Sequence, residues 1–300
     1  MSDNFISSSK LSLLKYLLAG VLLLLSLGVL ILNWMFEEES PTFITSISHH
    51  TGAKSMLAVL AHPDDELLVT GLLIQAAEDP GIRTAVITAT KGEAGNPLPQ
   101  ISRMQDLGWV RKAEALKNTW ALGVEHHTVL DFPDGGLIQT PRSAITDVIR
   151  SAMLEHKPDL LVTFWPESGF SDHADHKRIG LIAETLANEF KNSPVDGYAG
   201  PHKIAYPLAP RRMMNYFAGD TGKEVVANQP LANYSQDGEA WAKLRGWEIH
   251  ASQSDYVWNA YGFPAWFVHA LYDKEYYLVL ESDEIPIRYC FDKVQLIDGF

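Results

Sequence analysis

Residues Tyr16 to Trp34 form an uncharged, largely apolar stretch of nineteen residues, which limits the environments in which this segment can lie. At about 1.5 Å of rise per residue, a helix of this length crosses roughly one hydrocarbon core. A cleaved signal peptide is the alternative, but the stretch is longer than a typical signal core and no small-residue cleavage site follows it. We therefore predict a retained transmembrane anchor within residues 11–36, preceded by a short tail of residues 1–10.

Charges on the two sides of this stretch predict its orientation. Lys10 and Lys15 precede it, and three glutamates follow it at positions 37–39. Under the positive-inside rule, the tail stays in the cytoplasm and the remainder of the chain is exported. We expect the polar residues 37–52 to be a linker and residues 53–300 to form a single domain on the extracytoplasmic side of the membrane.

Composition argues against nucleic-acid binding, and it excludes both an intramolecular disulfide and a cysteine-based metal site. With 37 acidic and 24 basic side chains, the formal net charge is −13, which disfavours nucleic-acid binding. Cys290 is the single cysteine, so the chain can form neither an intramolecular disulfide nor a cysteine-based zinc cluster. Any metal site must therefore use histidine and carboxylate ligands.

Short apolar runs alternate with longer amphipathic ones after residue 53. This alternation predicts an α/β fold with a Rossmann-like, mostly parallel sheet and helices on both of its faces. The expected strands are 55–60, 84–90, 127–130 and 160–164, and the expected helices are 66–77, 104–122, 141–156 and 173–190. Ligands of such sheets bind outside the carboxyl ends of the strands, so polar residues at those ends are candidates for a functional site.

The first polar cluster follows the first expected strand and reads His62-Pro63-Asp64-Asp65-Glu66. With Pro63 in the first turn of a helix, His62 and Asp65 converge on one point while Asp64 projects to a different side. Acids at a helix amino terminus are also stabilising without any catalytic role, which is the simpler interpretation of either aspartate alone.

The second cluster, residues 172–176, follows the fourth expected strand and contains His173 and His176, again three residues apart. His62, Asp65 and one of these two histidines would supply the three protein ligands of a catalytic zinc site, with the fourth position left for water. Incidental histidines explain one such cluster easily but two at equivalent strand ends poorly. The pair of clusters therefore predicts a metal site.

The two clusters resemble the hallmarks of the N-acetylglucosaminyl-phosphatidylinositol de-N-acetylase-like (PIG-L/LmbE) deacetylases, an HPDD(E) segment and a downstream HxxH. The resemblance is dense over residues 55–190. It includes a T-x-G-E-x-G-like loop at 90–95, with Lys91 where arginine is usual, and a short island at 250–253. Further matching segments are Arg111-x-x-Glu114 and Phe132-Pro133-Asp134-Gly135.

The resemblance implies one Zn²⁺ per chain, bound by His62, Asp65 and His176. It implies Asp64 as the general base and His173, protonated, as the residue that assists the oxyanion. The implied reaction is hydrolysis of the N-acetyl group of an N-acetylglucosamine-type sugar or sugar conjugate by a zinc-activated water. Fe²⁺ and Co²⁺ accept similar ligands and are alternative metals.

Other polar residues near the two clusters are weaker candidates. The candidates for substrate binding are Glu93, Asp134, His250 and Gln253, and those for supporting the catalytic residues are Asp175, as partner of protonated His173, and Glu66. Arg111 and Glu114 lie three apart on an expected helix, and pairs of this kind are more often structural than catalytic. We expect a structural role for both.

The sequence as a whole predicts a membrane-anchored, zinc-dependent N-deacetylase. Its expected partners are an N-acylated amino sugar or glycoconjugate and the membrane, and nucleic acid is not expected. Two alternatives stay open: an amidase that acts on a larger acylated amino-sugar conjugate, and a membrane-tethered carbohydrate-binding protein without turnover. The amidase needs the same metal chemistry, whereas a binding protein does not need a base at Asp64, so the presence of Asp64 counts against it.

Overall fold

The computed structural model describes residues 8–288, so Cys290 lies outside the described residues. An eight-stranded sheet with the order β1-β7-β8-β6-β5-β2-β3-β4 forms its centre. The strands are β1 Thr42–Phe43, β2 Ser55–Leu60, β3 Arg83–Thr90, β4 His126–Phe132, β5 Leu160–Val162, β6 Lys203–Leu208, β7 Tyr234–Asp237 and β8 Lys274–Glu281.

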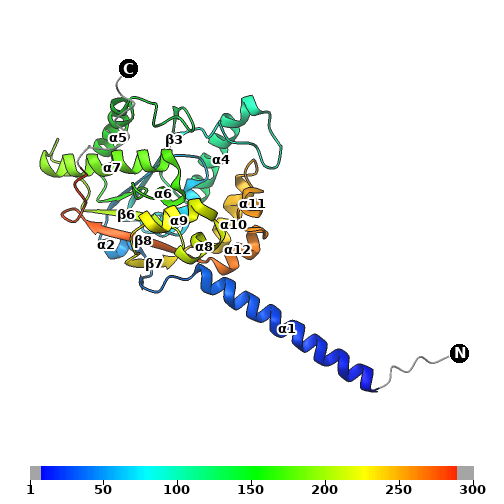
Figure 1. Ribbon diagram of the computed structural model, residues 1–300. Helices are drawn as coiled ribbons and strands as arrows, with labels where there is room; N and C mark the ends of the chain where they lie inside the picture. The colour runs from blue at the N-terminus through cyan, green and yellow to red at the C-terminus, as the bar shows by residue number, and fades with distance from the viewer. Residues whose placement is uncertain (1–7, 289–300) are drawn as a thin grey trace.

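Helices surround this sheet and one long helix leaves it (Figure 1). The α-helices are α1 Ser8–Phe36, α2 Ile47–Thr51, α3 Thr70–Glu78, α4 Leu107–Ala121, α5 Arg142–His156, α6 Gly169–Asp172, α7 Ala174–Asn192, α8 Arg211–Phe217, α9 Gly219–Asn228, α10 Ala240–Ile249, α11 Tyr256–Tyr261 and α12 Ala265–Leu271. Two short 3₁₀ helices, η1 Asp65–Val69 and η2 Met104–Asp106, precede α3 and α4.

The strand order determines where a ligand can bind. Neighbouring strands β6, β5, β2, β3 and β4 run parallel, whereas β8 pairs antiparallel with β6 and β7. The chain moves outward from β2 to β4 in one direction and from β5 to β6 in the other. Right-handed crossovers place the helices of these two halves on opposite faces of the sheet. The α/β prediction is confirmed, and the carboxyl ends of β2 and β5 flank the point at which the strand order reverses.

Local structure follows the expected pattern with two differences at helix starts. Every residue of β2 is buried, because helices cover both faces of the sheet at its centre. The helix expected from residue 66 opens instead with the 3₁₀ turn η1, since Asp64 adopts a left-handed backbone conformation with φ of +94°. The helix expected from His173 begins at Ala174, because the side chain of His173 caps it by accepting from the backbone N–H of Asp175.

The long apolar helix α1 projects away from the globular part of the molecule (Figure 1). Its candidate membrane span, Ser12–Phe36, has a mean hydropathy of 2.4 over its most apolar window, none of which is buried. Its last turn packs into the domain, where the ring of Phe36 stacks on Tyr272 at 5.1 Å. The stretch 37–52, expected to be a linker, contributes β1, which pairs with β7, and α2, which buries Ile47.

Candidate functional site

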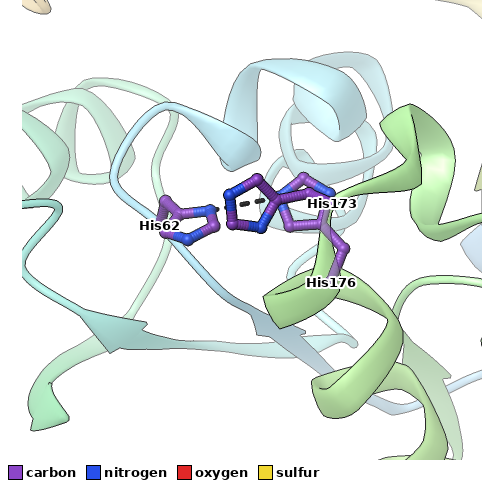
Figure 2. Close-up of side chains that lie close together, drawn as sticks. All are labelled: His62, His173 and His176. Carbon is purple, nitrogen blue, oxygen red and sulfur yellow. Dashed lines mark hydrogen bonds between the residues drawn. The ribbon is translucent and has the colours of Figure 1, made fainter. Parts of the chain in front are cut away.

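The two polar clusters meet at the point where the strand order reverses. His62 follows β2, and His173 and His176 lie at the start of α7, which comes after β5. Figure 2 shows the three imidazole rings beside one another, with a dashed line between His62 and His176. One nitrogen of each histidine lies within 4.8 Å of the other two, so the topology brings together side chains that are more than a hundred residues apart.

Four donor atoms of His62, Asp65 and His176, including both carboxylate oxygens of Asp65, lie close together. His62 Nδ1 lies 3.1 Å from His176 Nε2, which lies 3.1 Å from Asp65 Oδ1, and His62 Nδ1 lies 3.7 Å from Asp65 Oδ2. Bonds of about 2.1 Å at tetrahedral angles place two ligand atoms of Zn²⁺ about 3.4 Å apart. The two separations of 3.1 Å at His176 Nε2 are therefore close to those between ligands of one zinc ion, and either oxygen of Asp65 could supply the third donor.

The second nitrogen of each of these histidines has an acceptor of its own. His62 Nε2 lies 3.1 Å from Asp134 Oδ1 and 3.3 Å from Asp175 Oδ2, and His176 Nδ1 lies 2.8 Å from the carbonyl oxygen of Gly169. Metal-binding histidines are typically oriented in this way, because the outer N–H donates while the inner nitrogen lone pair faces the metal. The residues present thus fit a divalent cation.

The carboxylates around these donor atoms stabilise a positive charge among them. Burial alone lowers the pKa of His62, but its hydrogen bonds to Asp134 and Asp175 and the charge of Asp65 outweigh burial and raise this pKa to about 10. Burial raises the pKa of Asp65, but His176 and His62 outweigh it, so this pKa is lowered. A proton or a divalent cation can supply the positive charge that the carboxylates stabilise.

Asp64 lies beside this cluster, but its hydrogen bonds go to residues outside the cluster. Its Oδ2 accepts from Arg111 at 3.1 Å, and its backbone N–H donates to Glu66 Oε2 at 3.0 Å. Burial and the neighbouring charge of Asp65 raise the pKa of Asp64, although Arg111 opposes them. A carboxylate with a raised pKa that lies beside the three donor atoms is well suited to accept a proton.

A pocket of about 560 Å³ contains these groups. Polar side chains of both clusters line it together with Asp134, Gln253 and Arg111. Its wall also includes apolar and aromatic side chains, namely Leu67, Leu68, Phe170, Trp247 and Tyr256. No polar pattern marks these residues in the sequence, so only the fold could assign them to the site.

Comparison with known proteins agrees with this arrangement. The model of the family described as "PIG-L: GlcNAc-PI de-N-acetylase" matches residues 57–187, which include both clusters. Residues 57–187 belong to the PIG-L/LmbE family. The 1D-myo-inositol 2-acetamido-2-deoxy-alpha-D-glucopyranoside deacetylase of Corynebacterium urealyticum is 30% identical over 208 residues, which cover 61% of this chain and 61% of that protein. The chain spans less than two thirds of the length of the first curated relatives that it matches, 61% and 53%.

Solved structures of low sequence identity share the fold of this chain. The N,N'-diacetylchitobiose deacetylase of Pyrococcus horikoshii superposes with a TM-score of 0.59 at 20% identity and covers 82% of this chain and 91% of its own. Teicoplanin deacetylase Orf2, in a structure described as its zinc-inhibited form, has a TM-score of 0.53 at 18% identity and covers 77% and 99%. These two likenesses concern the architecture.

Arg111 holds two loops of this PIG-L/LmbE domain beside Asp64. Arg111 is 5% exposed. Its guanidinium group donates to the carbonyl oxygens of Pro63 and Gly92, both at 2.7 Å, and to the carboxylate of Asp64. Glu114 makes no pair with it but accepts from the backbone N–H and hydroxyl of Ser252 at 2.9 and 2.6 Å. Arg111 thus positions the candidate base.

Gly92 allows this close approach, which leads to a prediction. It has a φ of +69°, and a Cβ there would lie 2.3 Å from Arg111 Nη1. Replacing Gly92 with alanine should cost about 1–2 kcal/mol of backbone strain and roughly 1–3 kcal/mol more from the clash, and should slow turnover. Gly52→Ala is the matched control, since its φ is also +69° but no atom lies within 4 Å. Equal losses of thermal stability and of turnover in the two variants would contradict a clash at position 92.

The weaker candidates for substrate binding divide into two groups. Asp134 and Gln253 line the pocket, whereas Glu93 and His250 do not. Glu93 accepts from the backbone N–H of Asp134 at 2.9 Å, and the fully buried His250 bonds to Glu66. Glu93 and His250 thus contact other residues of the site, and Glu66 accepts from the backbone N–H of Asp64.

His173 lines the pocket in a different state from the one expected. Its Nδ1 accepts from the backbone N–H of Asp175, which leaves the proton of a neutral ring on Nε2. Burial, together with His62 and His176, lowers its pKa. The carboxylate of Asp175 bonds to His62 and to the backbone N–H groups of Gly135 and Leu137, and its charge, which acts to raise the pKa of His173, does not outweigh burial, His62 and His176.

Proposed function

We propose that this chain is a membrane-anchored, metal-dependent hydrolase that removes the N-acetyl group from an N-acetylglucosamine-type sugar or sugar conjugate. The observation that carries this proposal is the convergence of His62, Asp65 and His176 beside the uncoordinated carboxylate of Asp64. The names of the relatives, which are deacetylases of an inositol glucosaminide and of diacetylchitobiose, support the substrate class.

His62, Asp65 and His176 would hold the metal, for which Zn²⁺ suits the donor set best. When bound, Zn²⁺ supplies a Lewis acid that polarises the amide carbonyl and lowers the pKa of water. Asp64 accepts a proton from the water that attacks the carbonyl carbon, while Arg111 keeps its carboxylate in place. The proton passes to the departing nitrogen as the C–N bond breaks, which releases acetate and the free amine.

His173 assists this reaction as a hydrogen-bond donor. Because its Nδ1 accepts from the backbone of Asp175, its Nε2–H can donate to the oxygen on which negative charge develops. Because the neutral ring of His173 already carries a proton on Nε2, it does not need to take up a second proton before it donates. The aromatic rings of Trp247 and Tyr256 in the pocket wall offer faces on which a sugar ring can stack.

We also propose that α1 is retained as a membrane anchor and that the lysine asymmetry places the domain outside the cytoplasm. Three hydrogen bonds at its carboxyl end support retention. The hydroxyl of Tyr276 donates to the carbonyl oxygen of Phe36 at 2.9 Å, and Arg212 donates to those of Trp34 and Glu37 at 3.2 and 2.6 Å. A peptide removed after export would not contribute such contacts to the folded domain.

A panel of N-acylated amino sugars tests the proposed reaction. The full chain in detergent, with its metal content measured, should release acetate from N-acetylglucosamine compounds, lose this activity on chelation and regain it with Zn²⁺. Mass detection of the released acid separates the alternatives. Preferential release of a longer acid would favour the larger-acyl amidase, sugar binding without release would favour a binding protein, and full activity in verified metal-free protein would contradict the metal site.

A further inference from the structure

Exposed aromatic side chains lie on the part of the domain from which α1 leaves. They come from α8, α11, α12 and the turn between α11 and α12, and α8 and α12 pack directly on α1 (Figure 1). We call this set the aromatic collar, and its members, with their exposed fractions, are Tyr216 (66%), Phe217 (57%), Trp258 (57%), Phe263 (40%) and Trp266 (61%). These large aromatic rings form an exposed apolar surface. Surfaces of this kind commonly mark a site of contact with a membrane or another protein.

Two members of the collar, Phe217 and Phe263, lie beside the last turns of α1. Leu32, which belongs to the uncharged stretch, lines a small pocket together with Phe36, Phe217 and Phe263. Since Leu32 is part of the segment proposed to cross the hydrocarbon core, side chains that share its pocket lie at the boundary of that core. The adjacent Trp34 ring lies 4.4 Å beneath the guanidinium of Arg212, which places a positive charge at the same level.

The acidic residues beside the collar are paired within the protein. Glu37 bonds to Lys274 at 2.8 Å, the backbone N–H of Arg211 donates to Glu38 at 2.6 Å, and Glu39 pairs with Arg212. These pairs reduce the repulsion that three consecutive glutamates would otherwise exert on anionic lipid headgroups. The charge pattern is therefore compatible with close approach to a membrane surface.

We propose that the aromatic collar inserts into the interfacial layer of the membrane that α1 crosses, so that the domain rests on the bilayer in a fixed orientation. This inference depends on the retention of α1 proposed above. Tryptophan and tyrosine concentrate at membrane interfaces because their rings are apolar and their N–H or O–H groups stay hydrated. The lipid interface satisfies both halves of these side chains and is continuous with the exposed surface of α1.

The position of α11 relates this surface to the candidate active site. Tyr256, at its first residue, lines the pocket, and Tyr261, at its last, lies 6.0 Å from the ring of Phe36. One helix of six residues thus separates the pocket from the base of the anchor. A collar seated in the membrane would hold the pocket within reach of a substrate at the membrane surface.

Spin-label accessibility in the full chain tests the insertion. Cys290→Ser removes the native thiol, and single cysteines at Phe217, Phe263 or Trp266 carry a nitroxide in vesicles of phosphatidylcholine and phosphatidylglycerol. Leu24, 69% exposed on α1, is the lipid reference, and Trp120, 79% exposed at the end of α4, is the aqueous control. Labels in the collar should lose most of the accessibility to a water-soluble nickel chelate seen at position 120 and gain accessibility to oxygen. Retained acetate release and metal content verify the fold of each variant.

Each other outcome overturns the inference in a distinguishable way. Collar labels as accessible to nickel as Trp120, with Leu24 in lipid, would leave the anchor intact and refute insertion. A water-accessible label at Leu24 would refute the anchor and the insertion together. Collar labels protected from both nickel and oxygen would indicate that protein, either a second copy of this chain or another partner, covers the collar instead of lipid.

Discussion

Replacing Asp64 with asparagine should lower kcat by about 10²–10⁴-fold while the zinc content stays unchanged. Asparagine keeps the shape of the side chain and can still accept from Arg111, but it cannot take a proton from water. Because Asp64 bonds to Arg111 and Glu66 instead of joining the three converging donors, its loss should not weaken metal binding. Steady-state acetate release and elemental analysis of the same sample measure the two properties separately.

Asp131→Asn is the matched control for this variant. Its side chain is 78% exposed, pairs with Lys91 at 2.5 Å and does not line the pocket. The same loss of one negative charge should therefore leave turnover close to that of the unchanged chain. Unchanged turnover in Asp64→Asn would remove the assignment of the base, and a loss of zinc in that variant would instead make Asp64 a ligand.

Replacing His176 with alanine should abolish both metal binding and turnover. Its Nε2 lies 3.1 Å from both His62 Nδ1 and Asp65 Oδ1, and its ring stacks on Phe164 with centroids 4.0 Å apart. Removal of this ring takes away one of three protein donors, so zinc should fall from about one ion per chain to a small fraction of that value. Elemental analysis and acetate release after equilibration with limiting Zn²⁺ check this result.

His202→Ala controls for the loss of a histidine, since its side chain is 79% exposed and lies outside the pocket. It should keep both zinc and activity. His176→Gln fills more of the space beside Phe164, so circular dichroism of this second variant separates loss of the metal from loss of the fold. One full equivalent of zinc in folded His176→Ala or His176→Gln would contradict the proposed donor set.

Much of the parallel part of the sheet could be predicted from the sequence. The apolar run at 55–60 coincides with β2, because a strand buried on both faces needs an unbroken apolar run. The antiparallel edge made by β7 and β8 and the short helices α8 to α12 could not be predicted. Their segments are dense in aromatic residues, which suit cores, pocket walls and membrane interfaces equally, so local periodicity does not distinguish these environments.

Within the site, the predictable contacts were those between residues close in sequence or at equivalent strand ends. The spacing of His62 and Asp65 indicated that they converge, and the parallel topology brought them to His176. The bond between His250 and Glu66 joins residues 184 positions apart, and the contacts of Arg111 join two loops. No spacing rule reports such pairs, because they depend on how separate segments pack.

The sequence by itself determined the kinds of donor available for a cation, the order in which they follow the strands and the presence of an apolar helix at the amino terminus. The tertiary structure decided which atoms face one another. Asp134, Asp175 and Gly169 accept from the outer nitrogens of His62 and His176, and this directs the inner nitrogens toward Asp65. The physical reason is that buried polar atoms must find partners, and the fold alone determines which partners lie within reach.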